Sequence, residues 1–170
     1  AYVTGSNNAF QRNIISNNFS NGVILIDDED EPKHLGDNNT FDGNTIADNI
    51  KYGLSISSSN NTVINNTITG NDGCGVALFN GGNTIQFNTI TGNTGYGGIG
   101  SISTTANDIS NNWWGSATGP TNTNNPGGTG DVLWTNQDIS LLTYSPWLAN
   151  PPVHNVTQGT YHATIQAAIN

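Results

Sequence analysis

Basic residues are scarce in this chain. Arg12, Lys33 and Lys51 are the only three among 170 residues, against twelve Asp and Glu, so the formal net charge at pH 7 is −9. Nucleic-acid binding needs clusters of lysine and arginine against the phosphates, and we therefore expect no nucleic-acid partner. The same negative charge argues against anionic membranes and acidic polysaccharides as tight ligands.

Sulfur is almost absent as well. Cys74 is the single cysteine, which excludes a disulfide within the chain. It stands between two glycines with no histidine near it in phase, and this setting favours a small residue in a turn over a nucleophile. Long apolar runs are also missing, so we expect no membrane-spanning segment.

The chain has no methionine, and it shows no signal-peptide pattern. Both absences indicate a processed or excised piece of a longer precursor. Several N-x-S/T motifs fit an exported, glycosylated protein, and we predict an extracellular or cell-surface location. The glycosylation candidates are Asn18, Asn38, Asn60, Asn65 and Asn155.

The most informative feature present is a repeat of 22 residues. The segments NNTFDGNTIADN, NNTVINNTITGN and GNTIQFNTITGN begin at Asn38, Asn60 and Gly82. They share an Asn-x-Ile core followed by a further Asn, and earlier and later copies start at Asn13 and Asn112. A fixed period of this size is typical of a solenoid.

Apolar residues within the repeat alternate as in strands, and Asn and Gly separate them at sharp corners. The pattern predicts an all-β, right-handed parallel β-helix of about five coils. Residues at one phase should stack on their counterparts in ladders, and the corner asparagines should hydrogen-bond from coil to coil. The two predicted interior ladders are Phe10, Phe41, Val63, Ile85, Ile109 and Ile15, Ile46, Ile68, Ile90, Trp114.

Two interruptions break the period. The anchors are 31, 22, 22 and 24 residues apart, which places an insert at residues 27–36 and two extra residues around Ser101 to Thr105. Gly97 keeps the phase of earlier glycines at positions 22, 53 and 75. Gly98 and Gly100 then stand where large inner residues are due, so either Ile99 or Ile102 turns inward or the core narrows there.

With these residues in view, the repeat resembles that of the right-handed parallel β-helix proteins of the pectate-lyase-like superfamily, and especially its NosD-like branch. The segments NNWWGSATGP, NPGGTGD and SPWL, from Asn111, Asn125 and Ser145, resemble the closing part of such proteins. YHATIQAAI from Tyr161 resembles their opening part, a strand followed by a short helix. The resemblance implies the fold but does not specify a function, because lyases, hydrolases, adhesins and inert fibres all share this fold.

Three regions follow from this interpretation. Residues 1–120 form the coils, with an incomplete first coil, and residues 121–150 form a closing segment that caps the solenoid. Residues 151–170 are a linker followed by a strand and a short helix, at Thr164 to Ile169, that resembles the opening of another β-helix.

One metal site is a candidate. The run from Asp27 to Glu31 could hold Ca²⁺ through Asp27, Asp28 and Asp30, because Ca²⁺ takes several carboxylate oxygens. A solvated acidic loop explains the same residues, since consecutive acids cannot all face one ion. No other cofactor is expected.

The tryptophans are a candidate sugar platform. Trp113 and Trp114 are adjacent, so one points inward and one outward; Trp114 is in phase with the isoleucine ladder, which leaves Trp113 to contact a glycan. Trp134 and Trp147 lie in the closing segment, where we expect them to cover the open end of the solenoid.

Enzyme activity is the minority interpretation. Asp27 and Asp28 are adjacent, and neighbouring residues on a strand point to opposite faces, so they fit a glycosidase carboxylate pair badly. No row of acids or bases repeats in phase with Arg12 or the histidines.

The phase of the repeat also predicts how copies associate. Ala1–Val3 is in phase with the last strand of a coil, while the C-terminal segment resembles the start of one. We predict a non-catalytic structural subunit of a surface, sheath or filament assembly, in which copies join head-to-tail. The residues expected to contribute are Ala1, Tyr2, Val3, Val153, Val156, Ile165 and Ile169. The alternatives are a tandem array and a carbohydrate-binding or polysaccharide-processing module that contacts cell-surface glycans.

Overall fold

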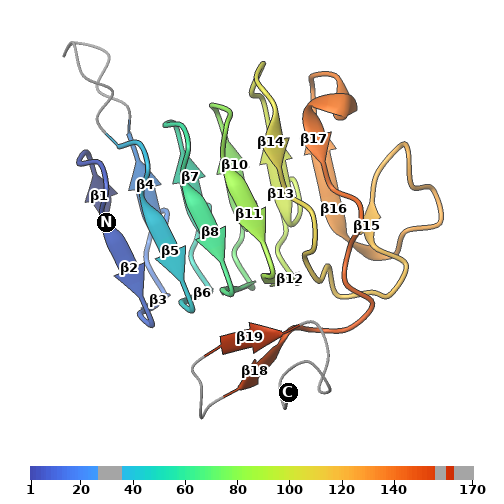
Figure 1. Ribbon diagram of the computed structural model, residues 1–170, viewed down its shortest axis with the longest axis horizontal. Coiled ribbons are helices and arrows are strands. Elements are labelled where there is room, and N and C mark those ends of the chain that lie inside the picture. Colours follow the sequence, from blue (N-terminus) through green and yellow to red (C-terminus); the bar gives the residue numbers. More distant parts are fainter. Residues whose placement is uncertain (27–35, 156–159, 163–170) are drawn as a thin grey trace.

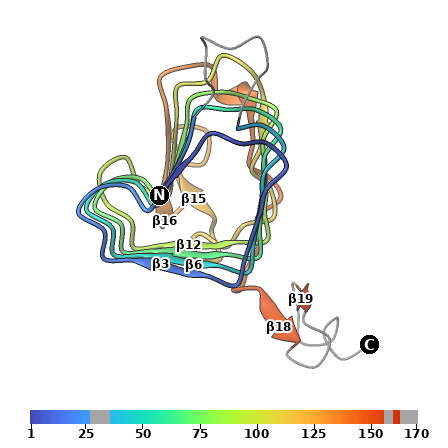
Figure 2. The ribbon, with the colours of Figure 1, turned by 90° about the vertical axis from the view of Figure 1, so that its left-hand side faces the viewer.

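The computed structural model describes residues 1–26, 36–155 and 160–162. Short strands recur in a fixed order, and most pair in parallel with the strand one turn later. Three sheets result, and they run along the length of the molecule around a common interior (Figures 1 and 2). This arrangement confirms the parallel β-helix that the repeat predicts.

The first sheet, called sheet A, has seven strands in the order β1-β4-β7-β10-β13-β16-β15. Their bounds are Tyr2–Val3, Val23–Leu25, Leu54–Ile56, Val76–Leu78, Ile99–Ser101, Gly130–Thr135 and Pro120–Thr121. The register pairs Val3 with Leu25, as the phase of the repeat predicts.

Sheets B and C complete the coil. Sheet B consists of β2 (Ala9–Gln11), β5 (Thr40–Asp42), β8 (Thr62–Ile64), β11 (Thr84–Gln86), β14 (Asn107–Asp108) and β17 (Leu142–Thr143). Sheet C consists of β3 (Ile14–Ser16), β6 (Thr45–Ala47), β9 (Thr67–Thr69) and β12 (Thr89–Thr91). A short 3-10 helix, Ile139–Leu141, precedes β17.

Strands β16 and β17 lie in the segment expected to close the solenoid. They pair with β13 and β14, so sheets A and B continue through it. After it, β18 (Val153–Asn155) and β19 (Thr160–His162) form a separate antiparallel pair. The strand expected from Val153 is thus present, whereas the helix expected at Thr164 to Ile169 lies outside the described residues.

The interior consists of the two predicted ladders and the inner row of sheet A. Phe41, Val63, Ile85 and Ile109 follow one another in sheet B, and Ile46, Ile68, Ile90 and Trp114 follow from sheet C; all are fully buried. Phe10 and Ile15 precede them at the first coil and are half-buried. The rings of Phe10 and Phe41 stack with centroids 4.6 Å apart, close to the usual spacing between strands.

Each of the three corners of a coil uses the same two-residue device. A residue with positive φ turns the chain, and the asparagine after it turns its side chain inward and hydrogen-bonds the next coil. The turning residues include Asn38, Asn60 and Gly82 at one corner, Asn65 and Phe87 at the second, and Asp48, Gly70 and Gly92 at the third. Asparagine and glycine recur there because they tolerate the left-handed backbone best.

Three buried asparagine ladders result. Two contain the repeat anchors and were predicted: Asn13-Asn44-Asn66-Asn88-Asn112 and Asn18-Asn49-Asn71-Asn93. The third, Asn8-Asn39-Asn61-Asn83-Asn107, was not. Asp131 ends the second ladder by accepting from the backbone N–H and side-chain Nδ2 of Asn93.

The register around Gly98 corrects one expectation. Val76 pairs with Ile99 and Leu78 with Ser101, so Gly98, not Gly97, takes the place of Gly75. One extra residue therefore lies in the turn before Ile99, where the Gly97 N–H donates to the Thr94 carbonyl, and only the second lies after Ser101. Ile99 turns inward and is fully buried, whereas Ile102 stays 43% exposed.

Candidate functional site

The outer face of sheet A forms the floor of a groove. The middle residue of each strand points outward, and the register lines up Ile24, Ser55, Ala77, Gly100 and Trp134. Side-chain size falls steadily from Ile24 to Gly100 and then rises abruptly at Trp134. The floor is therefore hollow over β10 and β13 and is closed at one end by the Trp134 indole.

Loops from sheet C to sheet A supply one wall of this groove. In the end-on view they swing outward beside sheet A, coil after coil (Figure 2). Tyr52, Cys74 and Tyr96 belong to successive loops of this series and line the hollow. Tyr52 packs along the next loop so closely that a Cβ on Gly73 would come within 2.7 Å of its ring.

Together these residues enclose a pocket of about 140 Å³, here called the aromatic pocket. Its lining is Tyr52, Cys74, Ala77, Leu78, Phe79, Tyr96, Gly100, Ile102 and Trp134. No member of this described lining is a carboxylate, an imidazole or a basic group. The pocket therefore offers rings, apolar surface and a few hydrogen-bonding groups, the usual makeup of a small-ligand site.

Two of the rings are held in place against each other. Tyr96 and Trp134 stack with centroids 4.5 Å apart and planes inclined by 30°, although Tyr96 is 53% exposed. The hydroxyls of Tyr52 and Tyr96 and the indole N–H of Trp134 donate to no other described residue. These polar groups are thus free to bind a ligand that lies against the rings.

Cys74 helps to form the floor of the aromatic pocket and is not a nucleophile. It is buried, and a Cβ on Gly100 would lie 2.6 Å from its sulfur, so the thiol fills the space above that glycine. Burial raises the pKa of the Cys74 thiol to about 11, which leaves it protonated at neutral pH. A protonated, buried thiol is a poor nucleophile, in agreement with the structural role predicted for this residue.

The four tryptophans separate into different roles. Trp114 is fully buried, as predicted, and Trp113 is half-buried beside Thr89 at the edge of sheet C, away from the aromatic pocket. Trp147 packs against the core and its Nε1 donates to the Ala117 carbonyl, which fits the expected cap. Trp134 corrects the expectation, because it lies on the outer face of sheet A instead of covering the end.

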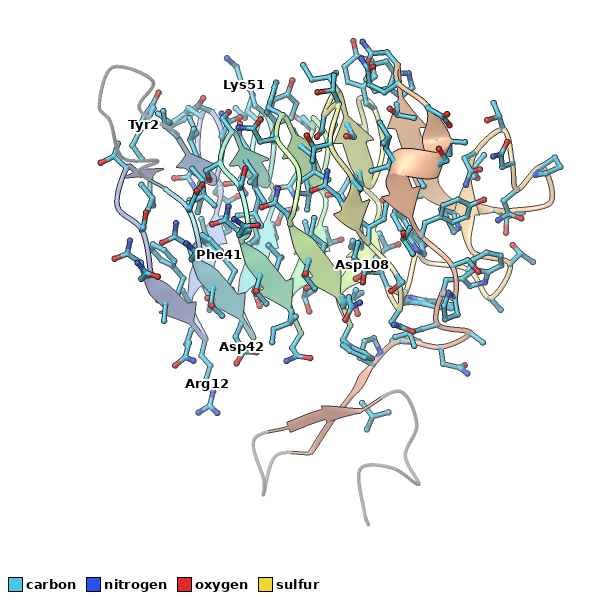
Figure 3. The ribbon with its side chains drawn as sticks, turned by 45° about the horizontal axis from the view of Figure 1, so that its top comes forward. Tyr2, Arg12, Phe41, Asp42, Lys51 and Asp108 are labelled. Atoms are coloured by element: carbon cyan, nitrogen blue, oxygen red, sulfur yellow. The ribbon has the colours of Figure 1, made fainter. Side chains whose placement is uncertain are left out.

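The acidic and basic candidates give no site within the described residues. Asp27, Asp28 and Asp30 lie outside those residues, so the structure does not place the calcium candidate. Among the residues that are described, no group of three or more His, Cys, Asp or Glu could hold a metal ion. Arg12 and Lys51 project from opposite edges of the coils (Figure 3).

Of the residues predicted for self-association, the structure describes Ala1, Tyr2, Val3 and Val153. Val3 is 9% exposed beside Leu25, and Tyr2 is 75% exposed. Val156, Ile165 and Ile169 lie outside the described residues. In the described part of the chain, no helix is both long and apolar enough to span a bilayer.

Most of the predicted glycosylation motifs lie at the corners of the coils, where a residue with positive φ is followed by an inward-pointing asparagine. Asn38 and Asn60 are exposed turning residues with φ of 58°, each followed by a ladder asparagine and a strand threonine. Asn65 also turns the chain, but its Nδ2 donates to Asp42. Asn18 is itself a ladder member whose Nδ2 donates to Asn49, so a glycan there would remove that bond. The side chain of Asn155 is not described.

Sequence reasoning missed the residues of the aromatic pocket. The available signal was the dipeptide Tyr-Gly, which occurs at Tyr52 and again at Tyr96, just before two strands of sheet A. When tyrosines recur at the same loop position of successive coils in a solenoid, they lie in a row on one face of the molecule. The two tyrosines are 44 residues apart, which is two full periods, although the extra residue before Ile99 places Tyr96 one residue earlier in its loop than Tyr52.

The fold and the pocket define a β-solenoid with an aromatic groove on one face, and comparison with known proteins agrees on the class. A family model described as "Right handed beta helix region" matches residues 1–127, and the chain belongs to that family. No curated protein and no solved structure matches the chain. Membership of the NosD-like branch stays a prediction.

Proposed function

We propose that this protein is a carbohydrate-binding β-helix that holds a neutral glycan in the groove on sheet A. The observation that carries the proposal is the aromatic pocket, where Tyr52, Tyr96 and Trp134 surround a floor of small residues. The C–H face of a pyranose is weakly positive and packs well on the negative face of an aromatic ring. The free hydroxyls and indole N–H would then bind the sugar hydroxyls at the ring edge.

The charge of the chain supports a neutral ligand. With a net charge of −9 and no basic residue in the described pocket lining, an acidic polysaccharide would be repelled rather than held. The same lining has no carboxylate pair for glycoside hydrolysis and no base for elimination. We therefore propose binding without catalysis, at an extracellular or cell-surface location.

A glycan array tests the proposal. We expect neutral oligosaccharides to bind the wild-type chain and Trp134→Ala to weaken binding at least tenfold, because truncating a central aromatic anchor removes most of the contact. Trp113→Ala is the matched control, since Trp113 lies outside the pocket, and it should bind as the wild type does. The proposal is wrong if no neutral glycan is retained, or if Trp113→Ala abolishes binding while Trp134→Ala does not. New reducing ends or unsaturated products on incubation would refute its non-catalytic part.

End-to-end association, the structural role predicted from the repeat, remains a second proposal. A specific observation favours it: β1, β2 and β3 are the last strands at one end of sheets A, B and C, and their outer edges pair with no described strand. Ile14 is 79% exposed at this end. Edge strands of this kind pair readily with another chain.

Sedimentation of the full chain and of residues 1–152 tests this second role. We expect the full chain to associate with rising concentration and the shortened chain to remain monomeric. A full chain that stays monomeric at high concentration, or a shortened chain that associates equally, contradicts the proposal.

A further inference from the structure

Four aromatic side chains lie around the aromatic pocket on three sides. Tyr52 and Tyr96 come from loops that precede strands of sheet A, Phe79 directly follows β10, and Trp134 belongs to β16. None of the four is among the residues that fill the interior of the solenoid. Phe79 and Tyr96 are exposed. Since packing of the core does not account for these rings, we ask which ligand they suit.

The electrostatic setting of the pocket favours a cation. An aromatic ring carries negative charge density on its face and attracts a cation that lies within about 6 Å of the ring centre. The whole chain adds to this attraction, because its net charge is −9. Neither Arg12 nor Lys51 lines the pocket, so no basic group of the described lining opposes a bound cation.

The lining also selects among cations. A primary ammonium or a guanidinium has several N–H donors, and each needs an acceptor when the group leaves water. In the described lining the only side-chain oxygens are the two tyrosine hydroxyls. A quaternary ammonium has no N–H group, and its methyl groups can pack against apolar walls such as Leu78 and Ile102. The pocket therefore suits a methylated ammonium better than lysine or arginine side chains.

The size of the pocket agrees with this choice. Its volume is about 140 Å³, and a cavity of about 150 Å³ accepts one benzene ring, which is about as large as a trimethylammonium group. Gly100 leaves the floor open beside Trp134, its partner in the register of sheet A. Tyr96 and Trp134 already stack on each other, so two of the rings are held in place before a ligand arrives.

We propose that the aromatic pocket binds a quaternary ammonium group, such as that of choline, among Tyr52, Phe79, Tyr96 and Trp134. This inference goes beyond the proposed function, because choline contains no sugar and its binding does not depend on a glycan. Free choline and a phosphocholine substituent of a larger molecule present the same group, and titration with each distinguishes the two sources.

NMR titration with choline, phosphocholine and 3,3-dimethyl-1-butanol, followed by the backbone amide signals of the pocket, tests the inference. The alcohol has the shape of choline with carbon in place of the charged nitrogen, so it measures apolar contact alone. We expect choline to bind at least fivefold more tightly than the alcohol, as cation–π attraction at a partly exposed site implies. Phosphocholine that binds as tightly as choline assigns the group to a substituent of a larger molecule, whereas much weaker binding assigns it to a free small molecule.

Tyr96→Leu should weaken choline binding at least fivefold and abolish the preference for choline over the alcohol, because an apolar side chain stays while the ring is lost. Tyr52→Leu, on an earlier loop, should act in the same way, so the result does not depend on one variant. Tyr2→Leu is the matched control, since Tyr2 is an exposed tyrosine of sheet A that does not line the pocket.

Equal affinity for choline and the alcohol, or an equal effect of Tyr2→Leu and Tyr96→Leu, overturns the inference. If choline does not bind while neutral glycans are retained on the array, the inference fails and the proposed function stands. If choline binds and no neutral glycan is retained, the proposed function fails and the inference stands.

Discussion

Asn66 shows how single amides connect the coils. Its Oδ1 accepts from the backbone N–H and the Nδ2 of Asn44 at 2.8 and 2.9 Å, and its own Nδ2 donates to Asn88 Oδ1 at 3.0 Å. The same Nδ2 also reaches the carbonyls of Phe41 and Ile64. One buried side chain thus satisfies polar groups from three successive coils, which explains why asparagine recurs at this place in the repeat.

Replacing Asn66 by alanine should destabilise the protein by about 3 kcal/mol, because the buried Asn44 N–H loses its acceptor and the Asn44 Nδ2 and the Phe41 and Ile64 carbonyls each lose one hydrogen bond. The free energy of unfolding in guanidinium chloride measures this effect. Asn13→Ala is the control at the exposed end of the same ladder, where water can replace the lost bonds, and it should cost about 1 kcal/mol. Equal losses at both sites would contradict the interpretation that burial makes the ladder stabilising.

The residue scale also shows why the sequence predicted two ladders and missed the third. Asn44 begins the Asn-x-Ile motif of the repeat and Asn49 follows it, and both are recognisable because they recur every 22 residues. Asn39 follows another asparagine, and that pair resembles an ordinary turn or a glycosylation motif. Only the positive φ of Asn38 and the inward side chain of Asn39 reveal that the first turns the chain and the second bonds the next coil.

At the scale of the strand, small residues decide how closely coils approach. Gly22, Gly53 and Gly75 immediately precede the strands β4, β7 and β10 of sheet A. A Cβ on any of them would lie 2.6 to 2.7 Å from the carbonyl oxygen of the next glycine in the row. Their backbones are not left-handed, since none has positive φ. Glycine is required there by close packing of backbone on backbone.

Gly75→Ala should therefore destabilise the protein by at least 2 kcal/mol, because its methyl group would push on the Gly98 carbonyl in a region that cannot relax freely. Thermal unfolding followed by circular dichroism measures the loss. Gly127→Ala is the matched control, since its new Cβ would have no neighbour within 4 Å, and its melting temperature should stay close to that of the wild type. A Gly75→Ala variant as stable as Gly127→Ala would show that the coils are more compliant than their spacing implies.

The strand scale explains the limits of prediction as well. Where the period held at 22 residues, the pairing of β7, β10 and their neighbours followed directly from the spacing. Between Asn93 and Ile99 the period changed by one residue, and a turn closed by Gly97 absorbed it. A hydrogen bond within one loop set the register there, and no pattern of apolar residues reports such a bond.

On the scale of the whole molecule, the repeat predicts the solenoid. The loops between its strands determine what the outer face of sheet A can bind. The interior ladders run the length of the described coils without a row of acids or bases. In the described part of the chain, aromatic rings with unpaired polar groups lie together where loops bulge over the outer face of sheet A and where β16 places Trp134 beside them. The sequence alone could not bring Tyr96 and Trp134 together, because 38 residues and a complete turn of the closing segment separate them.

The indole N–H signals in a ¹H–¹⁵N correlation spectrum give the most direct test of glycan binding in this groove. The chain has four tryptophans and hence four such signals, which single Trp→Phe substitutions assign. On titration with a neutral hexasaccharide, the signal of Trp134 should shift in a saturable manner, while those of buried Trp114 and of Trp113 on sheet C stay in place. A spectrum in which Trp134 does not move, or in which the signal of Trp113 moves instead, would contradict the assignment of this groove as the binding site.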